Sequence, residues 1–186
     1  MFLLLFLLTI NRYSYGPGNN GEVVSESSPL PDSTTAAPRS LRLVNAEKNV
    51  LAKKGAVLRL AGLYALERGA HNYWIEKADG HVKGSKDGII NLLHYDDAAG
   101  ACLAALKVDN DIAGKIFLIS DGRPASRFSI CESALKAKKY SGMAMPTFGE
   151  DDDTAKGKIY DGKFSNEYLQ WEPKYESFDI FMESSQ

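Results

Sequence analysis

Short apolar segments alternate with helix-forming segments between residues 40 and 140, and this alternation restricts the possible folds more than any other feature. The predicted strands lie at 56–64, 89–95 and 115–120, and the predicted helices at 39–53, 71–78, 96–107 and 126–139. Strands that alternate with helices form βαβ units, in which the strands run parallel. The segment KIFLIS (115–120) is apolar on both faces, as in a parallel sheet covered by helices. The sequence therefore predicts an α/β fold with a mostly parallel sheet.

The segment 17–38 has the composition of a loop, because it contains four prolines and many Ser, Thr and Asn residues. The glycines of YGPGNNG (15–21) match the G-x-G-x-x-G spacing of a dinucleotide-binding loop. Such a loop must lead directly into a helix, whose N-terminus then faces the phosphates, whereas Pro29 and Pro31 follow here. We therefore predict a turn at 16–21. Gly55 is expected to end the helix at 39–53.

The first nine residues, MFLLLFLLT, form an apolar run with two interpretations. A buried strand is favoured, since such strands read as short continuous apolar segments. A secretory signal at residues 1–10 is the alternative, although no Lys or Arg precedes the run and no A-x-A cleavage site follows it. The run is much shorter than the roughly 20 apolar residues that a transmembrane helix needs.

Composition and charge restrict the class of protein further. The chain of 186 residues is 44% hydrophobic and has a net charge of −2, which fits one globular domain. This near-neutral balance, together with the lack of a long Lys/Arg stripe, argues against nucleic acid and anionic membranes as partners.

The cysteines and histidines do not predict a metal site. Cys102 and Cys131 lie in apolar helical patterns without CxxC spacing, so buried thiols are expected rather than a disulfide or a zinc site. His71, His81 and His94 form no HxxxH or HExxH pattern. His94 and Asp97 are expected to be neighbours, with the imidazole next to a helix N-terminus, and a structural hydrogen bond there is favoured over a catalytic role.

Two further patterns carry chemistry only in a particular context. GKIYDGKF (157–164) matches a phosphate-binding loop, but Phe164 replaces the hydroxyl residue that binds magnesium, and no suitable strand and helix are predicted around it. Tyr73 and Lys77 form the only Tyr-x-x-x-Lys pair, an arrangement that lowers the pKa of the phenol for proton transfer. Two exposed residues of a helix are the favoured interpretation. The EDDD run (150–153) is expected to be solvated.

Several segments, in this order, resemble the C-terminal portion of the extended and atypical short-chain dehydrogenase/reductases, the NAD(P)-dependent epimerase/dehydratase group. Tyr15-Gly16 is similar to the Tyr-Gly that follows the family's central strand. The other similar segments are VLRLAGLYA (57–65), INLLHYDDAAGACLAAL (90–106), GKIFLISDGRPASR (114–127) and WEPKYESFDIFM (171–182).

This resemblance implies a partial Rossmann-like parallel sheet with flanking helices and a small C-terminal cap on the substrate side. Residues 1–14 would be an apolar leader or a truncated central strand, 15–140 the C-terminal half of the NAD(P)-binding domain, and 141–186 the cap and tail helices. The implied ligands are NAD(P) and a small molecule or sugar nucleotide. The implied residues are Gly62, Leu63 and Tyr64 toward the cofactor, and Tyr15, His94 and Asp97 toward the substrate.

The departures from the family pattern limit what this chain is expected to do. No cofactor fingerprint precedes the resembling segments, and no tyrosine lies between Pro17 and Leu63, where the family's catalytic Tyr-x-x-x-Lys belongs. No catalytic residue is therefore assigned, and the incomplete chain is expected to lack catalysis by itself. The alternative is a non-catalytic binding module that associates with itself or another chain through its exposed sheet edge. A cytoplasmic or plastid location is favoured over secretion.

Overall fold

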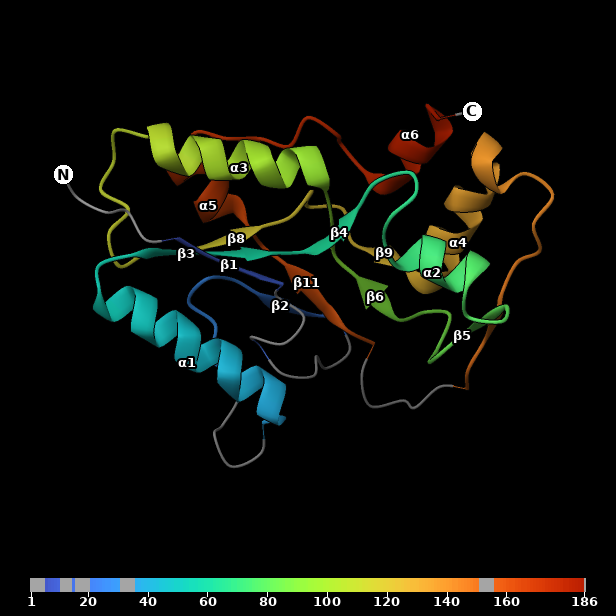
Figure 1. The fold of residues 1–186 in the computed structure, drawn as a ribbon, viewed down its shortest axis with the longest axis horizontal. Coiled ribbons are helices and arrows are strands. Elements are labelled where there is room, and N and C mark those ends of the chain that lie inside the picture. Colours follow the sequence, from blue (N-terminus) through green and yellow to red (C-terminus); the bar gives the residue numbers. More distant parts are fainter. Residues whose placement is uncertain (1–5, 11–14, 16–20, 31–35, 151–155, 186) are drawn as a thin grey trace.

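The computed structural model describes residues 6–10, 15, 21–30, 36–150 and 156–185. Its central feature is a sheet of three parallel strands, β1 (Phe6–Ile10), β3 (Ala56–Leu60) and β8 (Ile116–Ile119), in the order β1-β3-β8. Figure 1 shows α1 (Pro38–Ala52) on one side of this sheet, and α3 (Tyr95–Lys107) with α5 (Lys163–Leu169) on the other. The predicted α/β fold with a parallel sheet is confirmed, and β1 overlaps the second half of the apolar run at the N-terminus.

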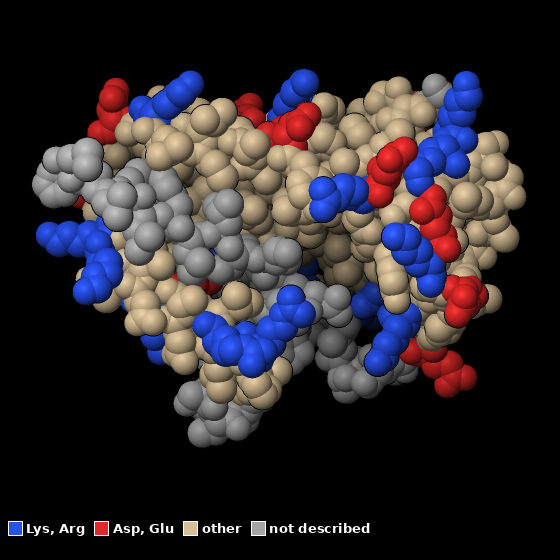
Figure 2. Space-filling model, in the orientation of Figure 1, with Lys and Arg blue, Asp and Glu red and all other residues tan. Residues whose placement is uncertain are grey.

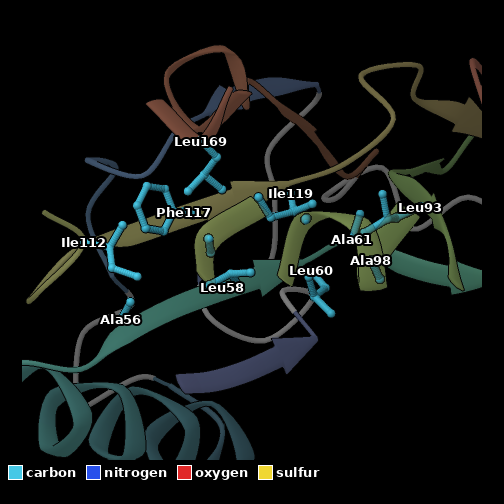
Figure 3. Packing of buried hydrophobic residues seen from close by; sticks show 12 residues of the cluster. Ala56, Leu58, Leu60, Ala61, Leu93, Ala98, Ile112, Phe117, Ile119 and Leu169 are labelled. Atoms are coloured by element: carbon cyan, nitrogen blue, oxygen red, sulfur yellow. The ribbon is translucent and has the colours of Figure 1, made fainter. Parts of the chain in front are cut away.

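The main core lies between the sheet and the helices α3 and α5. Buried Leu58 and Phe117 come from the strands, and α3 contributes the small residues Ala98, Ala101 and Ala105. Figure 3 shows Leu169 of α5 pointing toward Phe117 and Ile119. Small side chains let a helix approach the sheet closely, so the alanine-rich face of α3 is what allows this packing.

A second hydrophobic cluster lies beyond the end of the sheet. It joins α2 (Ala70–Glu76), α4 (Arg127–Lys136), the short helix Lys138–Tyr140 and α6 (Phe178–Glu183) to two short parallel strands, β4 (Gly62–Tyr64) and β7 (Leu92–His94). Its buried residues are Tyr64, Leu92, Ile130, Ala134, Ala137, Tyr140, Phe178 and Met182. On this end of the molecule, Lys and Arg alternate with Asp and Glu over the surface (Figure 2).

Three further strand pairs complete the described structure. β2 (Glu22–Val24) runs parallel to β11 (Lys158–Tyr160), and β5 (His81–Val82) runs parallel to β10 (Thr147–Phe148). β6 (Ile89–Ile90) pairs antiparallel with β9 (Ala125–Ser126). The prediction of an uninterrupted loop at 17–38 is therefore wrong for Glu22–Val24, which finds its partner more than 130 residues further along the chain.

Two predicted strands are each divided into two. The strand at 56–64 is interrupted at Ala61, and the strand at 89–95 at Asn91. The side chain of Asn91 accounts for the interruption of the strand at this residue. Its amide donates to Lys158 O (2.7 Å) and accepts from Tyr160 N (2.9 Å). The Asn91 side chain thus forms with the backbone of β11 two hydrogen bonds of the kind that a neighbouring strand would form.

The helix α1 ends differently from the sequence prediction. Lys54, not Gly55, adopts the left-handed conformation, with φ of 58°. Gly55 N instead donates to Val50 O (2.9 Å), which closes the last turn. Of the predicted turn at 16–21, only Gly21 lies within the described residues; its φ of 82° is typical of a glycine turn. In the EDDD run, residues 151–153 lie outside the described part.

Within the described residues, no helix is both long and apolar enough to cross a membrane.

Candidate functional site

The carboxyl ends of β4, β7 and β8 bring several polar side chains together. β4 and β7 pair in parallel with Tyr64 opposite His94. Asp121 follows β8, and its backbone N–H donates to Leu92 O of β7 (2.9 Å). In open α/β sheets ligands bind beyond the carboxyl ends of the strands, so this edge is the candidate site.

Tyr64 is the most enclosed residue of the site. Its side chain is 0% exposed, and its ring centroid lies 5.3 Å from that of His94 and 5.0 Å from that of Phe178. The phenol hydroxyl is buried and has no hydrogen-bond partner among the described residues. Burial raises the pKa of Tyr64 strongly, and the carboxylates of Asp121 and two other aspartates raise it further. Tyr64 is therefore a neutral phenol.

His94 begins helix α3. Its Nδ1 accepts a hydrogen bond from Asp96 N (3.1 Å), so the ring acts as the N-cap. Burial lowers the pKa of His94, although Asp96 and Asp97 oppose this effect. A neutral imidazole that accepts at Nδ1 suits this structural role.

Asp97 holds the C-terminal segment in place. Its carboxylate accepts hydrogen bonds from Lys174 N (2.7 Å) and Tyr175 N (3.1 Å). The side chains of His94 and Asp97 thus each bond to backbone N–H groups, and the bond of His94 lies at the helix N-terminus, where the sequence favoured a structural hydrogen bond.

Asp121 belongs to the site, and the sequence analysis missed it. One carboxylate oxygen accepts from Arg123 N (2.9 Å), while Oδ2 is buried without a partner among the described residues. Burial raises the pKa of Asp121 to about 7, with Asp97 and Asp179 raising it and Arg123 lowering it. The signals in the sequence were the position of this Asp directly after a strand and the resemblance of Asp121–Pro124 to the family's Asp-x-x-Pro turn, neither of which was carried to a role at the site.

Tyr15 lies in a separate cluster. Its hydroxyl donates to Ser25 O (2.8 Å), and the guanidinium of Arg59 lies 4.8 Å from the centre of its ring. The ammonium of Lys158 lies 5.5 Å from the same ring, and burial lowers the pKa of Lys158 to about 8. Tyr15 packs with Val24 and Leu118, whereas Tyr64 packs with the residues around α4 and α6.

Gly62 and Leu63 are half-buried beside β7. Gly62 N donates to Asn91 O (2.9 Å), and a Cβ at Gly62 would lie 3.1 Å from that oxygen. This close approach accounts for the glycine. The described residues do not form a pyrophosphate cradle, because no glycine-rich turn of the fingerprint type joins a described strand to a helix.

The two other sequence patterns fall outside the site. Tyr73 is 57% exposed on α2 and Lys77 follows the end of that helix, as the favoured interpretation predicted. In GKIYDGKF a helix does follow a strand, but β11 occupies the residues between the two glycines, where a phosphate loop would be. Cys131 is buried, and burial raises the pKa of its thiol to about 12; Cys102 is half-buried.

Two grooves are lined by sequence neighbours of Asp121, although Asp121 itself lines neither of them. The larger, of about 530 Å³, runs between α4 and α6. It is bounded by the ion pairs Arg123–Glu176 (3.3 Å) and Lys136–Glu183 (3.2 Å), and Phe178 lines it. The smaller, of about 440 Å³, includes Ser120 and Gly122.

The fold is shared with NAD-dependent enzymes that act on sugar nucleotides. The dTDP-glucose 4,6-dehydratase of Bacillus anthracis, in complex with NAD, matches with a TM-score of 0.70 and 19% identity over 98% of this chain and 60% of its own. The UDP-glucuronic acid 4-epimerase of Bacillus cereus, in complex with UDP-glucuronic acid and NAD, matches with a TM-score of 0.77 and 17% identity over 97% of this chain and 59% of its own. The UDP-glucose 4-epimerase of Thermotoga maritima, with UDP-glucose, matches with a TM-score of 0.76 and 19% identity over 97% and 61%.

These comparisons establish the fold class. The chain has the Rossmann-like fold of epimerases and dehydratases, and it spans about 60% of the length of the solved structures it matches. The fold that the sequence resemblance implied is thus confirmed. No protein-family model and no curated protein matches the sequence.

Proposed function

We propose that this chain forms the substrate-side part of an NAD(P)-dependent epimerase- or reductase-like site, and that its ligand is a sugar nucleotide. One observation carries the proposal: the carboxyl ends of three strands gather Tyr64, His94 and Asp121 at the edge where α/β folds bind ligands. Support comes from solved structures of the same fold, which hold UDP-glucuronic acid with NAD, or UDP-glucose.

For the cofactor, we assign to this chain only contacts on the nicotinamide side. When bound, NAD(P) would supply hydride transfer, and Gly62, Leu63 and Tyr64 would form the wall on its nicotinamide side. The described residues provide no cradle for the pyrophosphate, and the helix α1 carries no tyrosine for a Tyr-x-x-x-Lys dyad. We therefore assign this chain substrate binding without turnover, which also agrees with the alternative of a non-catalytic binding module.

Isothermal titration with separate ligands tests this proposal. We expect UDP-glucose or UDP-glucuronic acid to bind, and NADH and NADPH not to bind to this chain alone. UDP serves as the control for the contribution of the sugar. Micromolar binding of NADH would show that the chain contains a cofactor cradle after all. Failure of both UDP-sugars to bind would refute the assignment of a sugar nucleotide.

A further inference from the structure

Two buried polar groups of the candidate site have no hydrogen-bond partner among the described residues. One is the hydroxyl of Tyr64, a residue that is 0% exposed, and the other is the buried Oδ2 of Asp121, a residue that is 7% exposed. Buried polar groups in proteins are nearly always paired, so two such groups in one place call for an explanation.

The two groups lie at the same strand edge and do not bond to each other. Asp121 N donates to Leu92 O (2.9 Å) of β7, the strand that pairs with β4 and places Tyr64 opposite His94. A phenol donor and a carboxylate acceptor within bonding distance would satisfy each other, and they do not. The arrangement therefore suits a third group that accepts from Tyr64 and donates to Asp121. A hydroxyl does both.

The groove between α4 and α6 adjoins this pair, although neither Tyr64 nor Asp121 lines it. Phe178 lines the groove, and its ring lies 5.0 Å from that of Tyr64, so Phe178 contacts both. Arg123 lines the same groove, and its backbone N–H holds the other oxygen of Asp121.

The chemistry of the groove indicates an uncharged ligand rich in hydroxyls. Four serine hydroxyls line it, and its four acidic residues (Glu132, Glu176, Asp179 and Glu183) outnumber its two basic ones (Arg123 and Lys136). Carboxylates accept hydrogen bonds from hydroxyls, and this excess of negative charge repels phosphate.

We propose that Tyr64 and Asp121 form a hydroxyl-binding pair behind Phe178, which takes one hydroxyl of a hexose that enters along the α4–α6 groove. The pair specifies which part of the ligand this site recognises; the choice of a sugar rests on the proposed function. The diphosphate of a sugar nucleotide would lie outside the acidic groove. A rotation of the Phe178 side chain would open the path.

The variant Tyr64→Phe tests the pair, because it removes only the hydroxyl. D-glucose and D-galactose are the probes, with binding followed by saturation-transfer NMR and titration calorimetry. We expect millimolar binding to the unaltered protein and an affinity about tenfold lower in Tyr64→Phe, with no loss of thermal stability. Asp121→Asn should also weaken binding.

Tyr140→Phe is the matched control, since the buried hydroxyl of Tyr140 donates to Leu66 O (2.7 Å). This variant should lower the melting temperature and leave the affinity for the sugar unchanged. The proposal is overturned if Tyr64→Phe lowers the melting temperature as much as Tyr140→Phe, because the Tyr64 hydroxyl would then already have a partner in the free protein. It is also overturned if neither sugar binds, or if binding does not depend on Tyr64.

The hydroxyl-binding pair and the proposed function can be refuted independently of each other. Binding of UDP-glucose that is unaffected by Tyr64→Phe would refute the hydroxyl-binding pair and leave the proposed function standing. Binding of free hexoses that requires Tyr64, without binding of any UDP-sugar, would do the reverse.

Discussion

At the scale of single residues, the buried ion pair between Arg59 and Glu47 joins β3 to α1. Arg59 Nη2 lies 2.7 Å from Glu47 Oε2, and the two side chains are only 1% and 2% exposed. Removing one partner leaves an uncompensated buried charge, so we expect Glu47→Ala to lower the free energy of unfolding by about 3–5 kcal/mol. Urea denaturation measures this loss. The double variant Glu47→Leu with Arg59→Met, which removes both charges, should recover most of the stability; a double variant as unstable as the single one would contradict this account.

Asp121 should make the stability depend on pH. Its pKa is raised from 3.8 to about 7, so the folded protein holds a proton on Asp121 that the unfolded chain releases. The stability that this proton provides is fully present below pH about 4 and is lost as the pH rises through about 7.

The comparison of Asp121→Asn with the unaltered protein isolates this effect. Between pH about 4 and about 7, the free energy of unfolding of the Asn variant should fall less steeply than that of the unaltered protein. Burial lowers the pKa of His71 to about 4, which gives both proteins a loss of stability toward acid that cancels in the difference. Denaturant unfolding across this range provides the measurement, and parallel pH profiles would exclude a titrating Asp121.

At the scale of elements, the segment before α6 is fastened by Asp97. Because its carboxylate accepts two backbone hydrogen bonds, from Lys174 and Tyr175, we expect Asp97→Ala to cost about 2 kcal/mol and to increase amide exchange at those two residues. Hydrogen exchange followed by NMR checks both. Asp96→Ala is the comparison, because Asp96 lies in the same first turn of α3, is 67% exposed and accepts one hydrogen bond from the Tyr175 hydroxyl (3.3 Å), so its removal should cost less. Equal effects of the two variants would contradict a particular role of the two backbone hydrogen bonds to Asp97.

Elements defined by local pattern could be predicted from the sequence, and those defined by distant partners could not. The periodicity of residues 39–53 and 96–107 gave α1 and α3 to within one residue at each end. In contrast, β2 is a strand because β11 lies beside it, and nothing within its three residues indicates this. Asn91 was recognised only as an irregularity, since its role depends on the backbone of Lys158 and Tyr160.

In the candidate site, too, residues within recognisable local segments could be predicted, and those whose role depends on distant partners could not. Sequence resemblance placed Tyr64, His94 and Asp97 at one strand edge, and the structure brings the first two into ring contact. Asp121 was missed because its importance comes from burial and from the neighbouring carboxylates of Asp97 and Asp179, which lie 24 and 58 positions away in the sequence. The sequence also gave no indication that Phe178 covers Tyr64.

At the scale of the whole molecule, the sheet has an edge that can pair with another chain. Within the described part of the chain, β1 pairs with β3 on one side, and no other strand pairs with it. An unpaired strand edge presents a row of backbone N–H and C=O groups that templates further pairing. The exposed face of α3 offers a competing surface, since Leu103 and Leu106 are 53% and 56% exposed.

We predict that the protein associates with itself through β1 rather than through α3. Sedimentation velocity at increasing protein concentration should show a reversible shift from monomer to dimer. Leu103→Lys, which places a charge on the exposed face of α3, should leave the association unchanged. A dimer that dissociates in Leu103→Lys would place the interface on α3, and a protein that stays monomeric at every concentration would show that the β1 edge is protected in solution.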